Sequence, residues 1–258
     1  MPLSEPLRLK LLWLFLAVSA FAAIEPSPYE AMFFVCLIGF ARGGLTFDAA
    51  LAPLILVLFI FNAAGLIALI PYTQESESVT FTFITVYITL TTVLFATLVA
   101  GRPERMQAIR SGYVFAGVLA AALGTLGYFN VAGLSPYFTL YDGGRAMGPF
   151  KDPNVYGPFL VAPIGWVCQD LLLKRGSALR SVVLLLVLLL GLFLSFSRGA
   201  LIDALLTLAL VLGLTYLTTG SPKLRRRTVL TAVGCLVGFV AVVAAAMTVP
   251  SIREVATE

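Results

Sequence analysis

Residues 181–219 read SVVLLLVLLLGLFLSFSRGALIDALLTLALVLGLTYLTT and decide the fold class. As one helix, this stretch would run for about 58 Å at about 1.5 Å per residue. The hydrocarbon core of a bilayer is only about 30 Å thick, so the stretch fits two membrane spans. We predict that the two spans meet at a hinge near Ser197-Arg198-Gly199.

The composition of the whole chain agrees with this membrane interpretation. The 258 residues are 60% hydrophobic and 12% charged, with no histidine. Soluble domains are about 45–50% apolar and about 25% charged, so a soluble domain, a disordered chain, a disulfide scaffold and a basic nucleic-acid binder are excluded. Without an imidazole, this chain cannot form a Ser-His-Asp triad or a His-ligated zinc site.

We predict an all-α, polytopic transmembrane helical bundle of about nine spans, forming a single transmembrane domain over residues 1–258. Each candidate span has about 17–25 mostly apolar residues. The second is the weakest, because Arg42 and two glycines interrupt it. The predicted spans are 8–24, 30–46, 51–70, 80–100, 113–130, 157–173, 181–196, 200–219 and 229–248.

The basic residues predict the orientation. Cytoplasmic loops of membrane proteins carry an excess of Lys and Arg. With a cytoplasmic N-terminus, the inner segments hold thirteen of the 17 basic residues, which we interpret as a solvated inner rim: Arg8, Lys10, Arg42, Arg102, Arg105, Arg110, Lys174, Arg175, Arg180, Lys223, Arg225, Arg226 and Arg227. The outer segments hold only Arg145, Lys151, Arg198 and Arg253.

The longest outer loop, about 131–156, carries two of these exceptions. Residues 140–158 read LYDGGRAMGPFKDPNVYGP. The glycines let the backbone approach a ligand closely, and the prolines stiffen it. We predict that Asn154 caps the next helix, with Pro158 near its first turn. The positive end of that helix dipole, with Arg145 and Lys151, predicts an anion site.

The hinge carries a third exception, Arg198. An arginine between two apolar spans costs free energy, so it is a candidate functional residue. Asp203, about one turn further on, is a candidate partner, and Ser197 is a candidate supporting residue. A guanidinium binds two phosphate oxygens at once and does not lose its proton, which suits a diphosphate ligand.

Each of these residues also has an ordinary interpretation. Arg198 can be an interfacial side chain that pairs with Asp203, and Arg145 can be an ordinary loop charge. Neither role needs a ligand. Lys151 is tolerated at any membrane interface. Turn and cap roles are favoured over a general-base role for two acidic residues of the loop, Asp142 and Asp152. Near the inner face, Asp170 is spaced to pair with Lys174 four residues on.

The sequence predicts no cofactor and no metal. Its three cysteines, Cys36, Cys168 and Cys235, lie in apolar stretches without CxxC or metal-ligand spacing, and we interpret them as small buried hydrophobes. The sequence has no P-loop, no GxGxxG after a strand and no outer-face Asp-x-Asp cluster. Chemistry driven by a nucleotide is therefore not expected.

Two motifs together resemble the O-antigen ligase and O-antigen polymerase superfamily of bacterial envelope proteins. The first is GR at 144–145, GPF at 148–150 and DPNVYG at 152–157; the second is SRGA at 197–200. Between them lie an apolar span, a basic inner loop and another span. The resemblance covers about residues 25–219, and the two motifs occur in the same order and on the same predicted face.

The resemblance implies a metal-independent glycosyltransferase of the bacterial inner membrane that works at the periplasmic face. Such enzymes move a glycan from an undecaprenyl-diphosphate carrier to lipid A core, a growing glycan or another acceptor. It implies that Arg145 and Arg198 match the family's catalytic arginines, which hold the carrier diphosphate. It also matches Asn154 to the family's loop asparagine, and Lys151 joins the candidate diphosphate-binding residues.

The resemblance has one departure and leaves two alternatives. Ligases of this type carry a functional histidine on a large periplasmic loop after about nine spans, and this chain has none. We therefore expect the chain to be the N-terminal part of a longer family architecture. A transporter of a small anion or of a lipid-linked oligosaccharide is one alternative, and a non-catalytic, truncated member is the other.

Overall fold

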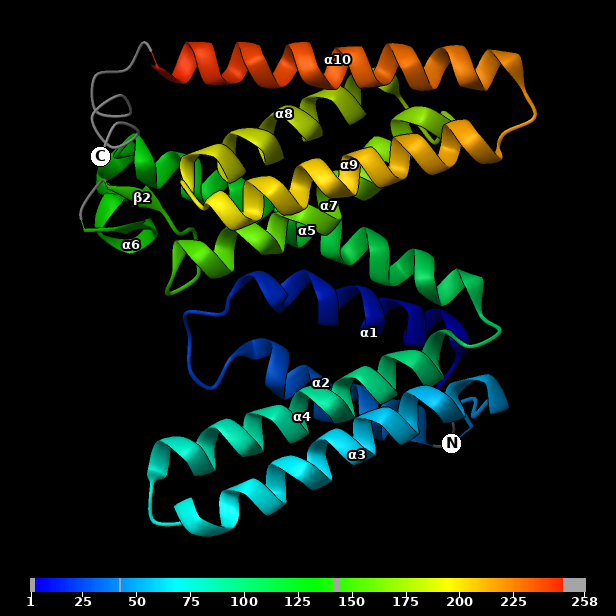
Figure 1. Ribbon diagram of the computed structural model, residues 1–258, viewed down its shortest axis with the longest axis vertical. Coiled ribbons are helices and arrows are strands. Elements are labelled where there is room, and N and C mark those ends of the chain that lie inside the picture. Colours follow the sequence, from blue (N-terminus) through cyan, green and yellow to red (C-terminus); the bar gives the residue numbers. More distant parts are fainter. Residues whose placement is uncertain (1–2, 42, 142–143, 248–258) are drawn as a thin grey trace. The chain divides into compact units, whose positions relative to one another are not determined.

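The computed structural model describes residues 3–41, 43–141 and 144–247, which are mainly helical. Arg42, Asp142 and Arg253 lie outside the described residues. The helices are as follows (Figure 1): α1 Glu5–Ala17, α2 Pro28–Ala41, α3 Ala52–Leu69, α4 Ser76–Val99, α5 Pro103–Tyr128, α6 Ser135–Phe138, α7 Pro153–Leu173, α8 Ala178–Leu194, α9 Arg198–Thr218 and α10 Pro222–Met247. The strands β1, Thr139–Leu140, and β2, Arg145–Ala146, pair to form a short hairpin.

The all-α fold class is confirmed, and a helix occupies each of the nine predicted ranges. Among the described residues, five helical segments are long and apolar enough to cross a membrane: Ala49–Tyr72, Ser76–Val99, Pro103–Tyr128, Pro153–Leu173 and Arg198–Thr218. Helices α2 and α8 are apolar but shorter. The fold is thus compatible with a membrane protein, while nine spans and a cytoplasmic N-terminus remain predictions.

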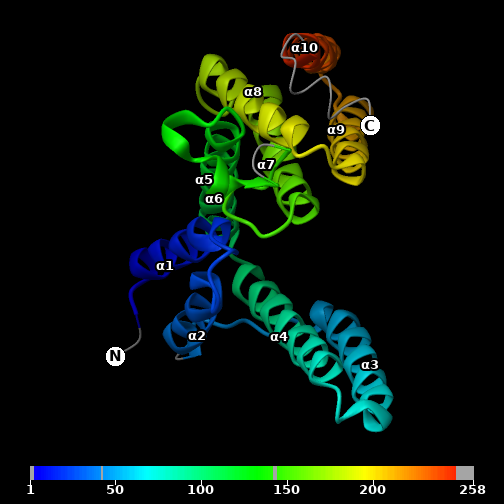
Figure 2. The same ribbon diagram turned by 90° about the vertical axis from the view of Figure 1, so that its left-hand side faces the viewer.

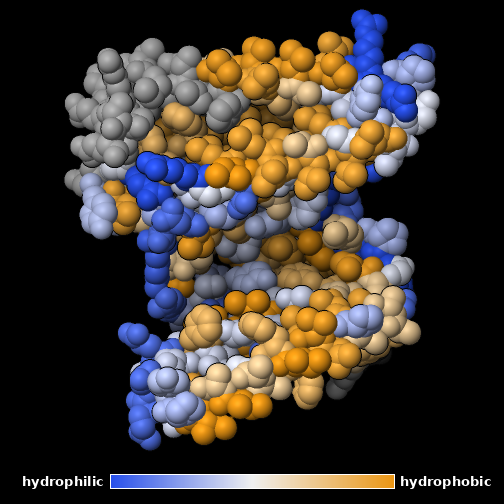
Figure 3. Space-filling model, in the orientation of Figure 1, coloured by the Kyte–Doolittle hydropathy of each residue, from blue (hydrophilic) through white to orange (hydrophobic). Residues whose placement is uncertain are grey.

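Apolar side chains cover the outward faces of several helices. In α3, no residue is buried within the protein. Figure 3 shows hydrophobic residues over the exposed faces of α3, α9 and α10. Soluble monomers rarely expose apolar patches larger than a few hundred Å². These surfaces therefore fit lipid better than water.

The chain forms two compact units: residues 1–15 with 30–109, and residues 16–29 with 110–258. The first unit contains α1 to α4 and the beginning of α5. Its helices are joined by ring contacts, such as Phe15 with Phe95 and Phe33 with Tyr87. Asn62 of α3 donates a hydrogen bond to the Thr89 hydroxyl of α4 at 2.7 Å. The same amide nitrogen donates to the Leu58 carbonyl at 2.8 Å, whereas the buried Asn62 Oδ1 has no hydrogen-bond partner among the described residues.

Arg105 is fully buried in the first unit, which corrects the prediction of a solvated inner rim. Its side chain is 1% exposed, and its Nε and Nη2 donate to the two carboxylate oxygens of Glu5 at 2.7 and 3.1 Å. Nη1 donates to the carbonyls of Gly44 and Leu98, and the guanidinium lies over the Phe40 ring. A buried guanidinium needs such partners because desolvation is costly. Two further rim arginines, Arg8 and Arg110, are also buried.

The second unit is built around α7, which packs against α8, α9 and α10. Figure 2 shows α10 nearly end-on, beside α8 and α9. Leu160 and Ile164 of α7 are fully buried. On α8, Leu188 is fully buried and Leu192 almost fully. Pro163 lies within α7, and a Cβ added to Gly117 of α5 would meet its ring at 2.6 Å. Backbone approach therefore brings α5 and α7 together.

Arg110 joins α5 to the last turns of α7 within this unit. It forms an ion pair with Asp170 at 2.5 Å and donates to the Trp166 carbonyl at 2.7 Å. The predicted pair of Asp170 with Lys174 is therefore wrong. Lys174 has a φ of 55° and ends the helix in the left-handed region, so its side chain leaves the face that carries Asp170.

The hinge predicted in the 181–219 stretch is confirmed. Helix α8 ends at Leu194 and α9 begins at Arg198. Ser197 is the N-cap of α9, and its hydroxyl accepts a hydrogen bond from the Ala200 amide at 3.4 Å. Between the helices, Phe196 takes a φ of 48°, which turns the chain back.

Candidate anion site at the starts of α7 and α9

The β-hairpin positions Arg145 near the start of α7. The strands are antiparallel, with Thr139 opposite Ala146 and Leu140 opposite Arg145. Tyr141 takes a φ of 54° at the beginning of the turn and is exposed. Part of the predicted outer loop is thus a β-hairpin, and Arg145 lies on its second strand.

Arg145 binds two segments that are far from the hairpin in sequence. Its Nε donates to the Ser195 carbonyl at 2.9 Å, and its Nη2 donates to Asn154 Oδ1 at 2.9 Å. Ser195 lies in the turn between α8 and α9, and Asn154 lies in the first turn of α7. One half-buried guanidinium therefore joins the loop motif to the turn that leads into the SRGA motif.

The N-termini of α7 and α9 lie against each other at this point. A Cβ added to Gly157 would lie 2.8 Å from Ala200 Cβ, 3.0 Å from Ser195 Oγ and 3.2 Å from Ser197 Cβ. Only glycine allows α7 to approach the turn this closely. The partial positive ends of two helix dipoles therefore meet beside Arg145.

Asn154 is not the N-cap of α7, which corrects the prediction for this residue. Asp152 is the N-cap, and its carboxylate accepts a hydrogen bond from the Asn154 amide at 2.6 Å. Pro153 explains the shift, because proline is favoured at the first helical position and holds the preceding residue extended. The predicted cap role of Asp152 is confirmed, while Pro158 lies inside the helix rather than near its first turn.

Arg198 is the first residue of α9 and is exposed. In the part of the chain that the structure describes, it forms no ion pair with Asp203, which is exposed too. Five residues at about 100° each place the two side chains about 140° apart around the helix. Arg198 therefore lies three residues beyond the carbonyl that Arg145 binds, without a neutralising carboxylate from Asp203.

Lys151 does have an acidic partner that the sequence analysis missed. Its ammonium forms an ion pair with Glu25 on the exposed surface. The same segments are joined by a hydrogen bond from the Ala23 amide to the Pro149 carbonyl at 3.0 Å. Nothing in the sequence pattern relates residue 25 to residue 151. Of the candidate cations, Lys151 is thus the one already paired.

Tyr156, in the first turn of α7, was not among the predicted residues. It is fully buried, and its hydroxyl has no hydrogen-bond partner among the described residues. A Cβ on Gly124 or Gly191 would lie 2.5 or 2.6 Å from this hydroxyl, and one on Gly148 would meet the ring at 2.8 Å. Glycines of α5, of the loop before α7 and of α8 thus leave room for this side chain.

An apolar cavity of about 220 Å³ lies between α8, α9 and α10. Its lining begins at Leu192 and Leu201, on either side of the Ser195–Arg198 turn, and reaches Cys235 and Leu236 of α10. The site therefore has a polar, cationic part at the helix starts and an apolar cavity that begins next to it. Within the described ranges, no group of three or more His, Cys, Asp or Glu side chains is placed to hold a metal ion.

A comparison of the chain with protein-family models, with curated proteins and with solved structures finds no match in any of the three.

Proposed function

We propose that this chain is a membrane glycosyltransferase of the O-antigen ligase or polymerase type. In this proposal it takes a glycan from an undecaprenyl-diphosphate carrier and transfers it to lipid A core or another glycan acceptor, at the periplasmic face of the bacterial inner membrane. The observation that carries the proposal is the arrangement around Arg145. This residue lies where two helix N-termini meet and binds both Asn154 and the turn that precedes Arg198.

The charges of this arrangement suit a diphosphate leaving group. When the bond between sugar and phosphate breaks, the negative charge on the diphosphate grows. Fixed donors and cations that face this charge lower the barrier, because they need no reorganisation during the reaction. We assign this role to the guanidinium groups of Arg145 and Arg198, helped by the dipoles of α7 and α9.

Asn154 and Ser197 support the two arginines in this proposal. The Asn154 amide oxygen and the Ser195 carbonyl fix the plane of the Arg145 guanidinium. Ser197 caps α9 and so fixes where Arg198 begins the helix. A fixed guanidinium loses less conformational freedom when it binds phosphate than a free one does.

The apolar cavity suits the lipid part of the same donor. A polyprenyl diphosphate needs a polar site at the membrane surface and an apolar path below it. The cavity between α8, α9 and α10 begins at the residues that flank the cationic turn. Its volume of about 220 Å³ is below the ~300–1,000 Å³ of pockets for whole small ligands, so it holds only part of a prenyl chain.

The test is glycan transfer in cells that carry alanine variants of the full-length gene. We expect Arg145→Ala and Arg198→Ala each to abolish attachment or extension of the surface glycan while the protein still inserts into the membrane. Arg102→Ala is the matched control, because it removes an exposed arginine far from this site in the sequence. Normal glycan ladders on a gel from both site variants would refute the proposal.

A further inference from the structure

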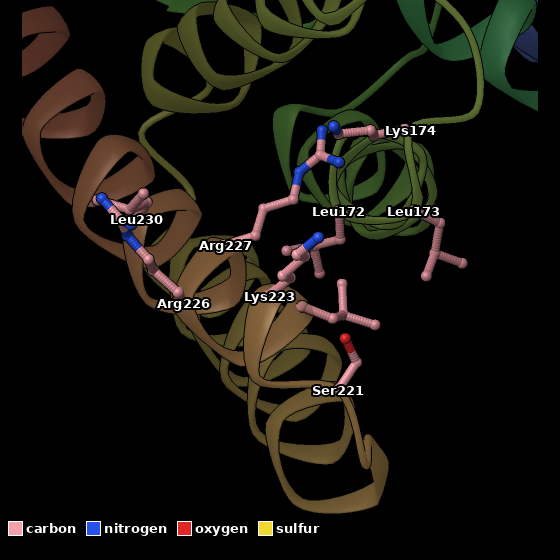
Figure 4. Close-up of a pocket in the computed structure, with 9 residues that line it drawn as sticks. Leu172, Leu173, Lys174, Ser221, Lys223, Arg226, Arg227 and Leu230 are labelled. Carbon is pink, nitrogen blue, oxygen red and sulfur yellow. The ribbon is translucent and has the colours of Figure 1, made fainter.

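A second cationic site lies at the opposite end of α7, where this helix ends beside the start of α10. Here a pocket of about 480 Å³ opens between the two helices (Figure 4). Its volume lies within the range of small-ligand pockets, ~300–1,000 Å³. The lining residues are Leu172, Leu173, Lys174, Ser221, Lys223, Leu224, Arg226, Arg227 and Leu230.

The pocket has four cationic side chains and no acidic one among its nine lining residues. Figure 4 shows the side chains of Lys174 and Arg227 extending toward one another. The nearest carboxylate of α7, Asp170, is paired with Arg110, and Arg225 stacks on Tyr216 outside the pocket. The cationic side chains that line the pocket therefore repel one another unless an anion enters it.

The start of α10 adds to this positive potential. The N-terminus of a helix carries a partial positive charge, so cations in its first turns are unfavourable there. Lys223, Arg226 and Arg227 nevertheless lie in the first two turns of α10. Figure 3 shows hydrophilic residues gathered at this end of the helix. Such an end binds an anion readily, since both the backbone amides and the side chains favour negative charge.

We propose that this pocket binds the phosphate headgroup of an anionic glycerophospholipid. The four leucines of the lining favour a lipid over a soluble phosphate, because they offer apolar surface beside the cations. The 21 residues of α7 span about 31 Å, close to the thickness of a hydrocarbon core. The pocket then lies at one membrane surface, and the Arg145 site lies at the other.

The site does not depend on glycan transfer, because it uses none of the residues assigned to the donor. The proposal predicts that a lipid stays bound to the protein on the cytoplasmic side, where it holds α10 against α7. Anionic headgroups are attracted to basic clusters at that surface, and the attraction falls within a Debye length. A pocket with apolar walls adds specificity to this general attraction.

The experiment measures phosphatidylglycerol binding to the purified chain in mixed detergent micelles, by native mass spectrometry and by titration with a fluorescent phosphatidylglycerol. We expect Lys174→Gln/Arg227→Gln to weaken binding about tenfold. The control variant, Arg175→Gln/Arg180→Gln, also removes two positive charges, one from the α7–α8 connection and one from the start of α8, both outside the pocket, and we expect it to bind like the wild type. Arg227→Lys keeps the charge and should retain most of the affinity.

Three results would overturn the proposal. Equal losses in both double variants would mean attraction to the whole basic surface rather than to a pocket. Equal binding of phosphatidylcholine would mean that the anionic charge is not recognised. Displacement of phosphatidylglycerol by millimolar inorganic phosphate, in the wild type but not in Lys174→Gln/Arg227→Gln, would assign the pocket to a soluble anion. Correct folding of each variant is checked by its thermal melting in the same detergent.

Discussion

The guanidinium of Arg145 and the side-chain amide of Asn154 are joined by a hydrogen bond of 2.9 Å across the chain turn that separates β2 from α7. The same guanidinium holds the Ser195 carbonyl, fifty residues further along the chain. Two hydrogen bonds from one planar group fix its orientation, and they place it where the dipoles of α7 and α9 converge. This geometry makes Arg145 the best-anchored cation of the candidate site.

The two separate hydrogen bonds of the Arg145 guanidinium predict that another positively charged side chain cannot replace arginine here. In Arg145→Lys, one ammonium takes the place of the two separate N–H groups that now bind Ser195 and Asn154. A hydrogen bond to a charged group contributes about 1.5–3 kcal/mol, so we expect donor turnover to fall about 10- to 100-fold. The measurement is transfer rate at saturating acceptor. A lysine variant with wild-type activity would show that only the charge matters.

The contact of Gly157 with the α8–α9 turn predicts a packing defect. A Cβ at this position would lie 2.8 Å from Ala200 Cβ, and overpacking typically costs about 1–3 kcal/mol. We expect Gly157→Ala to lower the melting temperature and to weaken donor binding, because α7 and α9 must move apart.

Gly199→Ala is the matched control for this change. Nothing lies within 4 Å of a Cβ at Gly199, and alanine is the better helix former. Its melting temperature should equal or exceed that of the wild type. If Gly157→Ala behaved the same way, the close approach of the two helices would be wrong.

The ion pair of Glu5 with Arg105 predicts a pH dependence of stability. The hydrogen bonds from Arg105 lower the pKa of Glu5, although partial burial opposes them. A carboxylate with a lowered folded-state pKa stabilises the fold above its ordinary pKa of about 4.3, and this contribution is lost as the pH falls below that value toward the folded-state pKa.

Glu5→Gln isolates this contribution from the other carboxylates. At pH 7 the variant leaves Arg105 without its counter-charge, and we expect a loss of about 3 kcal/mol in unfolding free energy. The difference in melting temperature between wild type and variant should shrink as the pH falls below about 4. A difference that stays constant down to pH 3 would argue against the ion pair as its source.

The orientation of the chain predicts which loops are accessible from each side. A cysteine or a tag placed at residue 76 should be labelled from the periplasm, and one at residue 224 only after the membrane is opened. The positive-inside distribution of Lys and Arg is the physical reason. Labelling in the opposite sense would reverse the assignment of both cationic sites.

The positions of the helices followed from the sequence because their cause is local. An apolar stretch of limited length, interrupted by polar residues, predicts where each helix lies and where 181–219 must break. The cap of α7 lies two residues before the predicted Asn154, because Pro153 favours the first helical position and so makes Asp152 the cap, although asparagine also favours caps.

The partners of buried charges did not follow from the sequence, because they are distant along the chain. Arg105 was interpreted as a rim charge, yet its partner Glu5 lies 100 residues earlier. Asp170 binds Arg110 rather than the nearby Lys174 for the same reason. Sequence spacing indicates which pairs can meet within one helix, but contacts between helices depend on packing.

The sequence offers candidate residues for this site, whose role there stays a prediction, but not their geometry. Arg145 and Arg198 stand out because basic residues are rare on the predicted outer face, and Asn154 stands out as a candidate helix cap and through the family resemblance. The contacts of Arg145 with Asn154 and with the turn before Arg198 depend on Gly157, which lets α7 approach the turn, and on the hairpin that carries Arg145. These are tertiary features for which the sequence offered only the glycine pattern.

The most direct test is binding of undecaprenyl diphosphate to the purified chain in nanodiscs, measured for the wild type, Arg145→Ala/Arg198→Ala and the control Arg175→Gln/Arg180→Gln. Loss of two charged contacts of about 1.5–3 kcal/mol each predicts affinity at least about 100-fold lower in the first variant, with no change in the control. Wild-type affinity in Arg145→Ala/Arg198→Ala would contradict the assignment of these two arginines to the diphosphate.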